Sequence, residues 1–298
     1  MDCNKKKLNV GGQAVIEGVM MRSPNYWAVA VRKPDGDIEV KKDRLKVLAE
    51  SSKIAKLPIV RGVLMLVSAL VLGIKALNFS ANIAYDEEED MSDWAIYGTI
   101  TIAFAIAIGV FFLLPLVLTK LMNFKSYFVF NLVDGIIRIL FFLVYVYFIS
   151  FMKDIKRIFE YHGAEHKVIY NYEENDHISV EEAKKYTTLH PRCGTSFLII
   201  VLVISIMLFS LVPKESPFYI KLLSRIVFIP FIAGISYEML KLSAKYQNNI
   251  FVKLFILPGL WLQKITTREP DEQQIEVAIE AMQAVLNLEK GEIDASKA

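Results

Sequence analysis

Residues 127–151 read YFVFNLVDGIIRILFFLVYVYFISF, and residues 153–166 continue as KDIKRIFEYHGAEH. The first stretch is longer than the roughly 20 apolar residues that a helix needs to cross a bilayer. The second is polar and basic, and it ends in two histidines on either side of Gly-Ala-Glu. This junction predicts a membrane helix followed by a polar segment rich in groups that bind metals.

Three further stretches have the length and apolarity of membrane spans: about 94–118, 196–212 and 218–240. Basic residues gather in the link 153–192, in the N-terminal segment and in the tail after 241. Because cytoplasmic loops carry the excess of lysine and arginine, these three regions are expected on the cytoplasmic face. Four spans satisfy that arrangement. The ambiguous apolar stretch 57–77 is therefore expected to lie at the membrane surface or to re-enter.

The predicted fold class is mainly α: a polytopic α-helical membrane protein of about four spans, with a small β-rich N-terminal element. Residues 1–57 form that cytosolic element, and 58–92 form an interfacial or re-entrant helix and an acidic linker. Residues 93–152 hold spans one and two. The cytosolic link with its histidines and cysteine is 153–195, spans three and four occupy 196–240, and 241–298 form an amphipathic cytosolic tail.

Local sequence patterns predict individual strands and helices near the two ends of the chain. Residues 26–32 and 37–40 flank Pro34-Asp35-Gly36, which predicts a β-hairpin, and 14–21 is expected as an earlier strand. Near the C-terminus, Pro258-Gly259 is expected to break an apolar stretch that lies on the membrane. Beyond Pro270, apolar residues at near-helical spacing predict an amphipathic helix over 267–288.

Composition excludes several classes of protein. A net charge of +2 gives no sign of nucleic-acid binding, and two distant cysteines imply no disulfide framework. The N-terminal segment is basic but lacks an apolar core, so no cleavable signal peptide is expected. Residues 11–24 are punctuated by glycines without matching a nucleotide-binding loop. Within them, Glu17 and Arg22 are interpreted as turn caps rather than site residues.

The histidines and one cysteine have the spacing of a metal site. His162 and His166 lie four residues apart, which puts them on one face of a helix, and Glu165 stands between them. His190 and Cys193 offer two more ligands in the same link. Zinc takes histidine nitrogen and cysteine sulfur, usually with four ligands. The order His-x-x-Glu-His is that of inverted zinc proteases, whose glutamate is the general base.

Three interpretations of this cluster remain open. In a catalytic site, His162, His166 and either His190 or Cys193 hold zinc, and Glu165 activates a water molecule in the open position. In a structural site, all four ligands close the coordination shell. Without a metal, the histidines belong to a basic loop that faces lipid headgroups. His177, the fourth histidine, is interpreted as a solvated loop residue.

Charged residues within the predicted spans form a second group of candidates. Asp134 and Arg138 lie four residues apart in span two, and Arg225 lies in span four. Charges in hydrocarbon are costly, so these side chains should face the bundle interior and pair with one another. They either line a polar cavity for a headgroup or an ion, or they form an ion pair between helices.

Four segments together resemble one family: GGQAVIEGVMMRSP (11–24), LPIVRGV (57–63), YHGAEHKVIYNYE (161–173) and LHPRCGTSF (189–197). In this order they are similar to the YqhQ-like family of bacterial membrane proteins, from about Gly11 to Thr266. Members of that family are described as predicted metal-dependent enzymes. The resemblance thus implies a metal at His162, Glu165, His166, His190 and Cys193, without implying a reaction or substrate.

We therefore expect a multi-pass protein of the bacterial plasma membrane with both termini in the cytoplasm. The expected function is that of a metal-dependent enzyme, with zinc as the cofactor and hydrolysis as the reaction. Its substrate would be a lipid or another membrane-associated molecule at the cytosolic face, and assembly into a homo-oligomer is left open. The alternative is a transporter-like or assembly protein with a structural metal.

Overall fold

The computed structural model of this chain describes residues 7–45, 55, 57–85, 93–175, 177–213, 215–246 and 249–295. Four strands form an antiparallel sheet in the order of the chain: β1 (Gly11–Val15), β2 (Gly18–Arg22), β3 (Tyr26–Arg32) and β4 (Ile38–Arg44). The expected hairpin is confirmed as β3 and β4, and Gly36 in its turn has a φ of +99°, which glycine adopts without strain.

The expected single strand over 14–21 is wrong. Those residues belong to two strands, β1 and β2, which pair through a tight turn at Ile16 and Glu17. Glu17 takes a positive φ of 50° there. The turn has no Asn-Gly or Asp-Gly pair, so the usual sequence signal for a hairpin is missing. The Glu17 carboxylate pairs with Arg157 and accepts a hydrogen bond from the Tyr161 hydroxyl, so distant partners accompany this unusual conformation.

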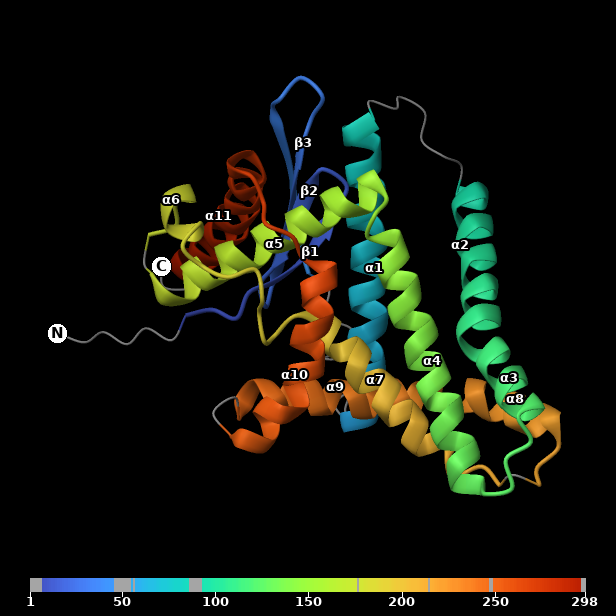
Figure 1. The fold of residues 1–298 in the computed structure, drawn as a ribbon. Coiled ribbons are helices and arrows are strands. Elements are labelled where there is room, and N and C mark those ends of the chain that lie inside the picture. The colour runs from blue at the N-terminus through green and yellow to red at the C-terminus, as the bar shows by residue number, and fades with distance from the viewer. Residues whose placement is uncertain are drawn as a thin grey trace.

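α5 (Lys153–Glu174) and α11 (Glu272–Ala295) pack on one another and on the sheet. The short α6 (Val180–Ala183) packs on these two helices and adds Ala183 to their common core. Together with the strands we call these three helices the sheet–helix body, which gathers at one end of the molecule (Figure 1). The predicted amphipathic tail helix is confirmed as α11, although it begins at Glu272. The five apolar residues that predicted it are all buried: Ile275, Val277, Ile279, Met282 and Val285.

The remaining helices are mostly apolar, and we call them the apolar helices. They are α1 (Pro58–Tyr85), α2 (Asp93–Ile108), the π-helical turn η3 (Gly109–Leu113), α3 (Leu114–Leu121), α4 (Tyr127–Ile149), α7 (Gly194–Phe209), α8 (Phe218–Val227), α9 (Ile229–Lys245) and α10 (Ile250–Thr266). Figure 1 shows α2 and α4 extending away from the sheet–helix body. The architecture is that of a polytopic helical membrane protein with a small N-terminal sheet.

Three helical segments among the described residues are long and apolar enough to cross a membrane: α1, the joined α2–α3 segment Tyr97–Leu121, and α4. A fourth span is possible if α8 and α9, which meet at a bend of 41°, cross together. The number agrees with about four spans, but the members differ. α7, expected as a span, has 16 residues, and α10 continues through Pro258 instead of breaking there.

α1 divides into two halves with different neighbours. Its first half crosses α9 so closely that a Cβ on Gly62 would lie 2.8 Å from the Cα of Gly234. Its second half packs on the sheet through Leu72 and Ala76. Exposed large apolar side chains lie in the first half, from Leu57 to Val71, and then only at Tyr85. Sheet contacts thus account for the apolarity of the second half.

The sheet and α5 lie on the same side of any membrane, because β1 packs directly on α5. Three complete crossings in succession by α1, α2–α3 and α4 would carry the chain to the opposite face. The contact therefore favours an α1 that enters the bilayer with its first half only. The expectation that this segment lies at the surface or re-enters is compatible with that contact and stays a prediction.

Candidate metal centre and adjoining cavity

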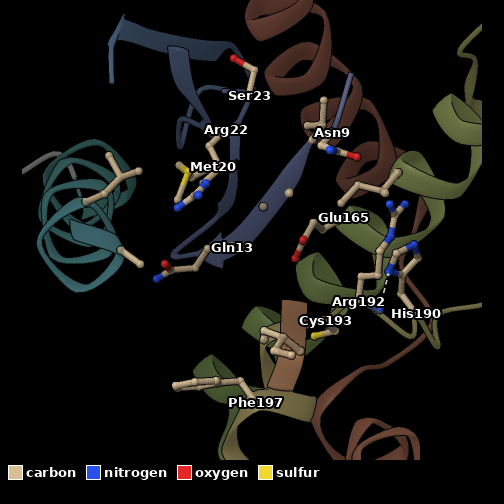
Figure 2. Close-up of a pocket in the computed structure, with 18 of the residues that line it drawn as sticks. Asn9, Gln13, Met20, Arg22, Ser23, Glu165, His190, Arg192, Cys193 and Phe197 are labelled. Carbon is tan, nitrogen blue, oxygen red and sulfur yellow. Dashed lines mark hydrogen bonds between the residues drawn. The ribbon is translucent and has the colours of Figure 1, made fainter. Parts of the chain in front are cut away.

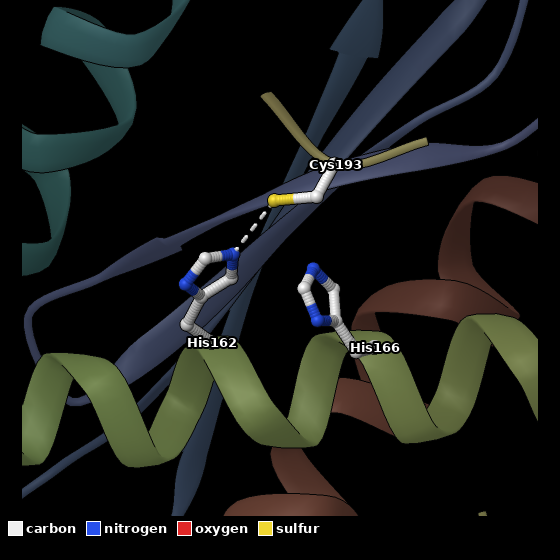
Figure 3. Close-up of side chains that lie close together, drawn as sticks. All are labelled: His162, His166 and Cys193. Atoms are coloured by element: carbon white, nitrogen blue, oxygen red, sulfur yellow. Dashed lines mark hydrogen bonds between the residues drawn. The ribbon is translucent and has the colours of Figure 1, made fainter. Parts of the chain in front are cut away.

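α5 carries the two histidines of the predicted pair on one face. The ring centroids of His162 and His166 lie 4.4 Å apart, as expected for residues one turn apart on a helix. Cys193 approaches both from the start of α7, where its sulfur accepts a hydrogen bond from the Thr195 amide. Figure 3 shows the three side chains converging.

The potential ligand atoms are close enough to share one ion. One atom each of His162, His166 and Cys193 lies within 4.8 Å of the other two, and the His162 Nε2 is 3.1 Å from the Cys193 sulfur. Zinc bonds of about 2.0–2.3 Å limit the separation of two ligand atoms to about 4.5 Å. Small rotations of the side chains would therefore bring all three into coordination distance.

Backbone carbonyls fix the tautomer of both rings. The Nδ1 of His162 lies 2.8 Å from the Thr266 carbonyl oxygen, and the Nδ1 of His166 lies 2.5 Å from that of Thr188. A carbonyl oxygen only accepts, so each Nδ1 must carry the proton and donate it. Each Nε2 is left with a lone pair directed to the cluster, and that of His162 faces the Cys193 sulfur 3.1 Å away. This is the orientation that outer hydrogen bonds impose on histidines that bind metals.

The Nε2 of His166 supports this assignment independently. It is buried and has no hydrogen-bond partner among the described residues. A buried polar atom without a partner costs free energy, so such atoms are rare. A metal ion would satisfy this nitrogen, and the set of two imidazoles and one thiolate suits zinc. The residues present therefore fit a zinc-type ion, with three protein ligands.

His190, the fourth expected ligand, lies beside the cluster but faces elsewhere. Its ring centroid is 5.6 Å from that of His166. Its Nδ1 accepts from the Arg192 amide, and its Nε2 lies 3.5 Å from a carboxylate oxygen of Glu173. Burial lowers the pKa of His190 to about 4, so the ring is neutral near pH 7. The structure thus brings together three of the four expected ligands.

Glu165, the expected general base, is buried and points toward β1. The absence of a side chain on Gly12 allows this approach, because a Cβ there would lie 2.8 Å from the Glu165 Cγ. Burial raises the pKa of Glu165, while His162, His190 and the Gly12 amide act in the opposite direction. The carboxyl group lines the same cavity as His166 and Cys193.

That cavity has a volume of about 590 Å³ and lies between the sheet–helix body and the apolar helices. Its polar wall includes Gln13, Arg22, Glu165 and Arg192, several of which appear in Figure 2. Its apolar wall comes from α1, α7 and α9. The sequence pattern around Arg22 favoured a turn cap, and no pattern marked Gln13. No spacing signal could place either one opposite Glu165.

The charged residues of the apolar helices form a separate cluster. Both Arg138 and Arg225 donate to one carboxylate oxygen of Asp134, at 3.0 and 3.1 Å. Both guanidinium groups also lie over the ring of Phe209. All three charged side chains are buried. Of the two alternatives, the structure favours the ion pair between α4 and α8, since the pocket that Arg225 lines has a volume of only about 10 Å³.

Comparison with known proteins identifies the family. The model of the DUF1385 family, proteins of unknown function, matches residues 57–288. The chain belongs to this family. The uncharacterized protein YqhQ of Bacillus subtilis (strain 168) is 36% identical over 297 residues, which cover 94% of this chain and 92% of that relative. No solved structure matches the chain.

The DUF1385 match includes all three converging ligands and Glu165 but starts after the sheet. The similarity to YqhQ extends over nearly the whole chain and confirms the YqhQ-like family that the sequence motifs indicated. Neither comparison names a reaction, a substrate or a metal. A reaction, a substrate and a metal can therefore be inferred only from the geometry of the site.

Proposed function

We propose that this protein is a metal-dependent hydrolase that acts at the membrane surface. The observation that carries the proposal is the shared tautomer of His162 and His166, whose Nδ1 atoms both donate to backbone carbonyls. Histidines that bind a metal through Nε2 almost always donate their Nδ1 proton to an acceptor in this way. The partnerless Nε2 of His166 adds to the argument.

His162, His166 and Cys193 would hold a divalent ion, with zinc the best match to the ligand types. A bound zinc ion supplies a Lewis acid and lowers the pKa of a coordinated water. Three protein ligands are the pattern of catalytic zinc, since structural sites have four. The cavity beside the cluster provides room for a substrate where a fourth protein ligand would otherwise stand.

Glu165 would act as the general base. It lies one residue before His166 on α5, and its carboxyl group faces the cavity. The backbone of Gly12 lies against that carboxyl group, since a Cβ there would stand 2.9 Å from its Cδ. In this role Glu165 would accept a proton from the attacking water and return it to the leaving group. Hydrolysis is the reaction class that needs only these parts.

The proposed location is the cytoplasmic face of the bacterial plasma membrane. The link 153–192 and both ends of the chain carry the excess of lysine and arginine. Short loops with that bias remain in the cytoplasm. The substrate would then be a lipid or another membrane-associated molecule that reaches the cavity from the cytoplasmic leaflet.

A structural metal site in a non-catalytic protein is the alternative. It gains support from the position of the ligands, because Cys193 caps α7 while the histidines belong to α5. An ion there would clamp the apolar helices to the sheet–helix body. Under this alternative, removing the metal would destabilise the protein, and Glu165 would have no special role.

Metal content tests the common part of both proposals. We expect about one equivalent of zinc in the purified full-length protein, and a His162→Ala/His166→Ala double variant should retain almost none. His177→Ala is the matched control, because His177 is exposed and outside the cluster. Elemental analysis of the three proteins measures this directly. Stoichiometric zinc in the double variant, or none in the wild type, would refute a metal centre at this place.

A further inference from the structure

Arg22 is a positively charged residue in the wall of the cavity. Several other arginines pair with carboxylates, as Arg61 does with Glu238 and Arg192 does with Glu173. No hydrogen bond or ion pair holds the guanidinium of Arg22 among the residues that the structure describes. It is also largely removed from water, and this burial lowers its pKa.

A partly buried guanidinium without a counter-charge is unfavourable unless a ligand supplies one. Its planar fork of donors suits phosphate and carboxylate oxygens. Gln13 lies beside it on β1, and Figure 2 shows both side chains reaching from the sheet toward α1. Together they offer amide and guanidinium donors on the side of the cavity opposite Glu165. This part of the cavity has the chemistry of an anion site.

The part of the cavity wall that the apolar helices supply is mostly apolar. Met65, Leu66 and Ala69 of α1, Phe197 of α7 and Leu240 of α9 line it. Leu66 also belongs to the exposed apolar face of α1, beside Val67 and Leu70. The cavity wall is therefore continuous with a surface that suits the hydrocarbon of a bilayer. A ligand here has a charged end at the sheet and an apolar end toward the membrane.

We propose that this cavity binds a lipid with an anionic headgroup: Arg22 and Gln13 bind the headgroup, and α1, α7 and α9 contact its chain. As the substrate class of the hydrolase, this lipid rests on the function proposed above. Its binding does not, since Arg22 is not among the metal ligands. The headgroup would lie in the cavity that also contains Glu165, His166 and Cys193.

Lipid binding to the purified full-length protein in uncharged detergent tests the inference. Native mass spectrometry would compare phosphatidylglycerol, which is anionic, with phosphatidylcholine, which has no net charge. We expect wild type to bind phosphatidylglycerol preferentially and Arg22→Gln to lose roughly tenfold in that affinity, as for a lost charged hydrogen bond. Arg22→Lys should retain part of it, and Arg44→Gln, at the exposed end of β4, should bind like wild type.

Two further experiments test separately the apolar wall and the need for lipid chains. Ala69→Phe fills the apolar wall and should weaken binding of both lipids. Glycerol phosphate, which has the charge without the chains, should compete poorly with phosphatidylglycerol. Equal competition would show a soluble anion site and overturn the lipid assignment. Equal binding of the two lipids by wild type, or unchanged binding by Arg22→Gln, would overturn the role of Arg22.

Metal variants distinguish this result from the proposed function. His162→Ala/His166→Ala should lose zinc but still select phosphatidylglycerol, while Arg22→Gln should keep zinc. Retained zinc also shows that Arg22→Gln has folded. If the wild type selects phosphatidylglycerol but holds no zinc, the hydrolase proposal fails and the lipid site stands. If the wild type holds zinc but does not select phosphatidylglycerol, the lipid site fails and the hydrolase proposal stands.

Discussion

The sheet–helix body and the apolar helices place their apolar side chains in opposite ways. Within residues 8–45, 153–189 and 265–291, no large apolar side chain is exposed among those that the structure describes. In the apolar helices such exposure is common, as at Trp94, Tyr97 and Phe128, with 85%, 65% and 70% of their surface accessible. Apolar groups turn away from water but have no reason to avoid lipid.

The same contrast extends to charges. The body has its ion pairs at or near its surface, such as Arg32 with Glu276. The apolar helices bury Asp134 between two arginines instead. The candidate metal centre belongs to both regions: its histidines come from the body, whereas Cys193 and the Thr266 carbonyl come from the ends of apolar helices. If the proposed function holds, the groups at this boundary would meet their substrate from the membrane.

The largest effect that we predict is for a substitution of Glu165, in the cavity between the two regions. Glu165→Gln should lower hydrolysis of an anionic phospholipid by the zinc-loaded protein roughly 10²–10⁴-fold, as for a lost general base. Elemental analysis should show unchanged zinc. Glu174→Gln, an exposed residue on the same helix, is the control and should retain full activity. A fully active Glu165→Gln would rule out Glu165 as the general base.

Asp134→Ala should strongly destabilise the apolar helices. It leaves Arg138 and Arg225 buried without their shared carboxylate, and breaking a buried ion pair costs about 3–5 kcal/mol. Thermal unfolding in detergent should show a clear fall in Tm, with zinc content unchanged in the protein that remains folded. Simultaneous loss of zinc would mean that the two regions are more closely coupled than we infer.

A matched pair of isoleucines compares the regions directly. Ile275→Ala removes a fully buried side chain from α11 and should cost about 2–5 kcal/mol. Ile106→Ala, in α2, removes a side chain that is 61% exposed and should cost about 0.5 kcal/mol or less. Thermal unfolding of both variants in the same detergent measures the difference. Similar costs would contradict the assignment of α2 to a lipid-facing surface.

The smallest effect that we predict is a difference between the two halves of α1. In membranes, a lipid-soluble carbene reagent should label Val67, while Ala76 should be protected because it is buried against the sheet. Mass spectrometry of the labelled peptides measures both positions. Reactivity that is equal along α1 would argue for a helix that lipid surrounds over its full length.

Spacing along the chain was sufficient for several features. The interval between His162 and His166 gave their common helical face, and the apolar period after Pro270 gave the buried face of α11. Pro34-Asp35-Gly36 gave the β3–β4 hairpin. Each of these depends on neighbours within a few residues, where backbone geometry alone fixes which side chains share a face.

Other features depended on distant partners and escaped the sequence. Pro258 was expected to end a helix, yet α10 continues through it. Apolarity over 57–77 could not distinguish lipid contact from sheet contact, and α1 has both. The same limit applies to Arg22, because the absence of a counter-charge is visible only when every surrounding element is in place.

The sequence alone was therefore enough to predict a helical membrane protein with a histidine pair suited to a metal, since hydropathy and helical period are local properties. Only the tertiary structure selected Cys193 over His190 as the third converging ligand and set Arg22 in the same cavity as Glu165. The reason is physical: ligand geometry and charge balance arise from segments that are far apart in the chain and meet only in the packed fold.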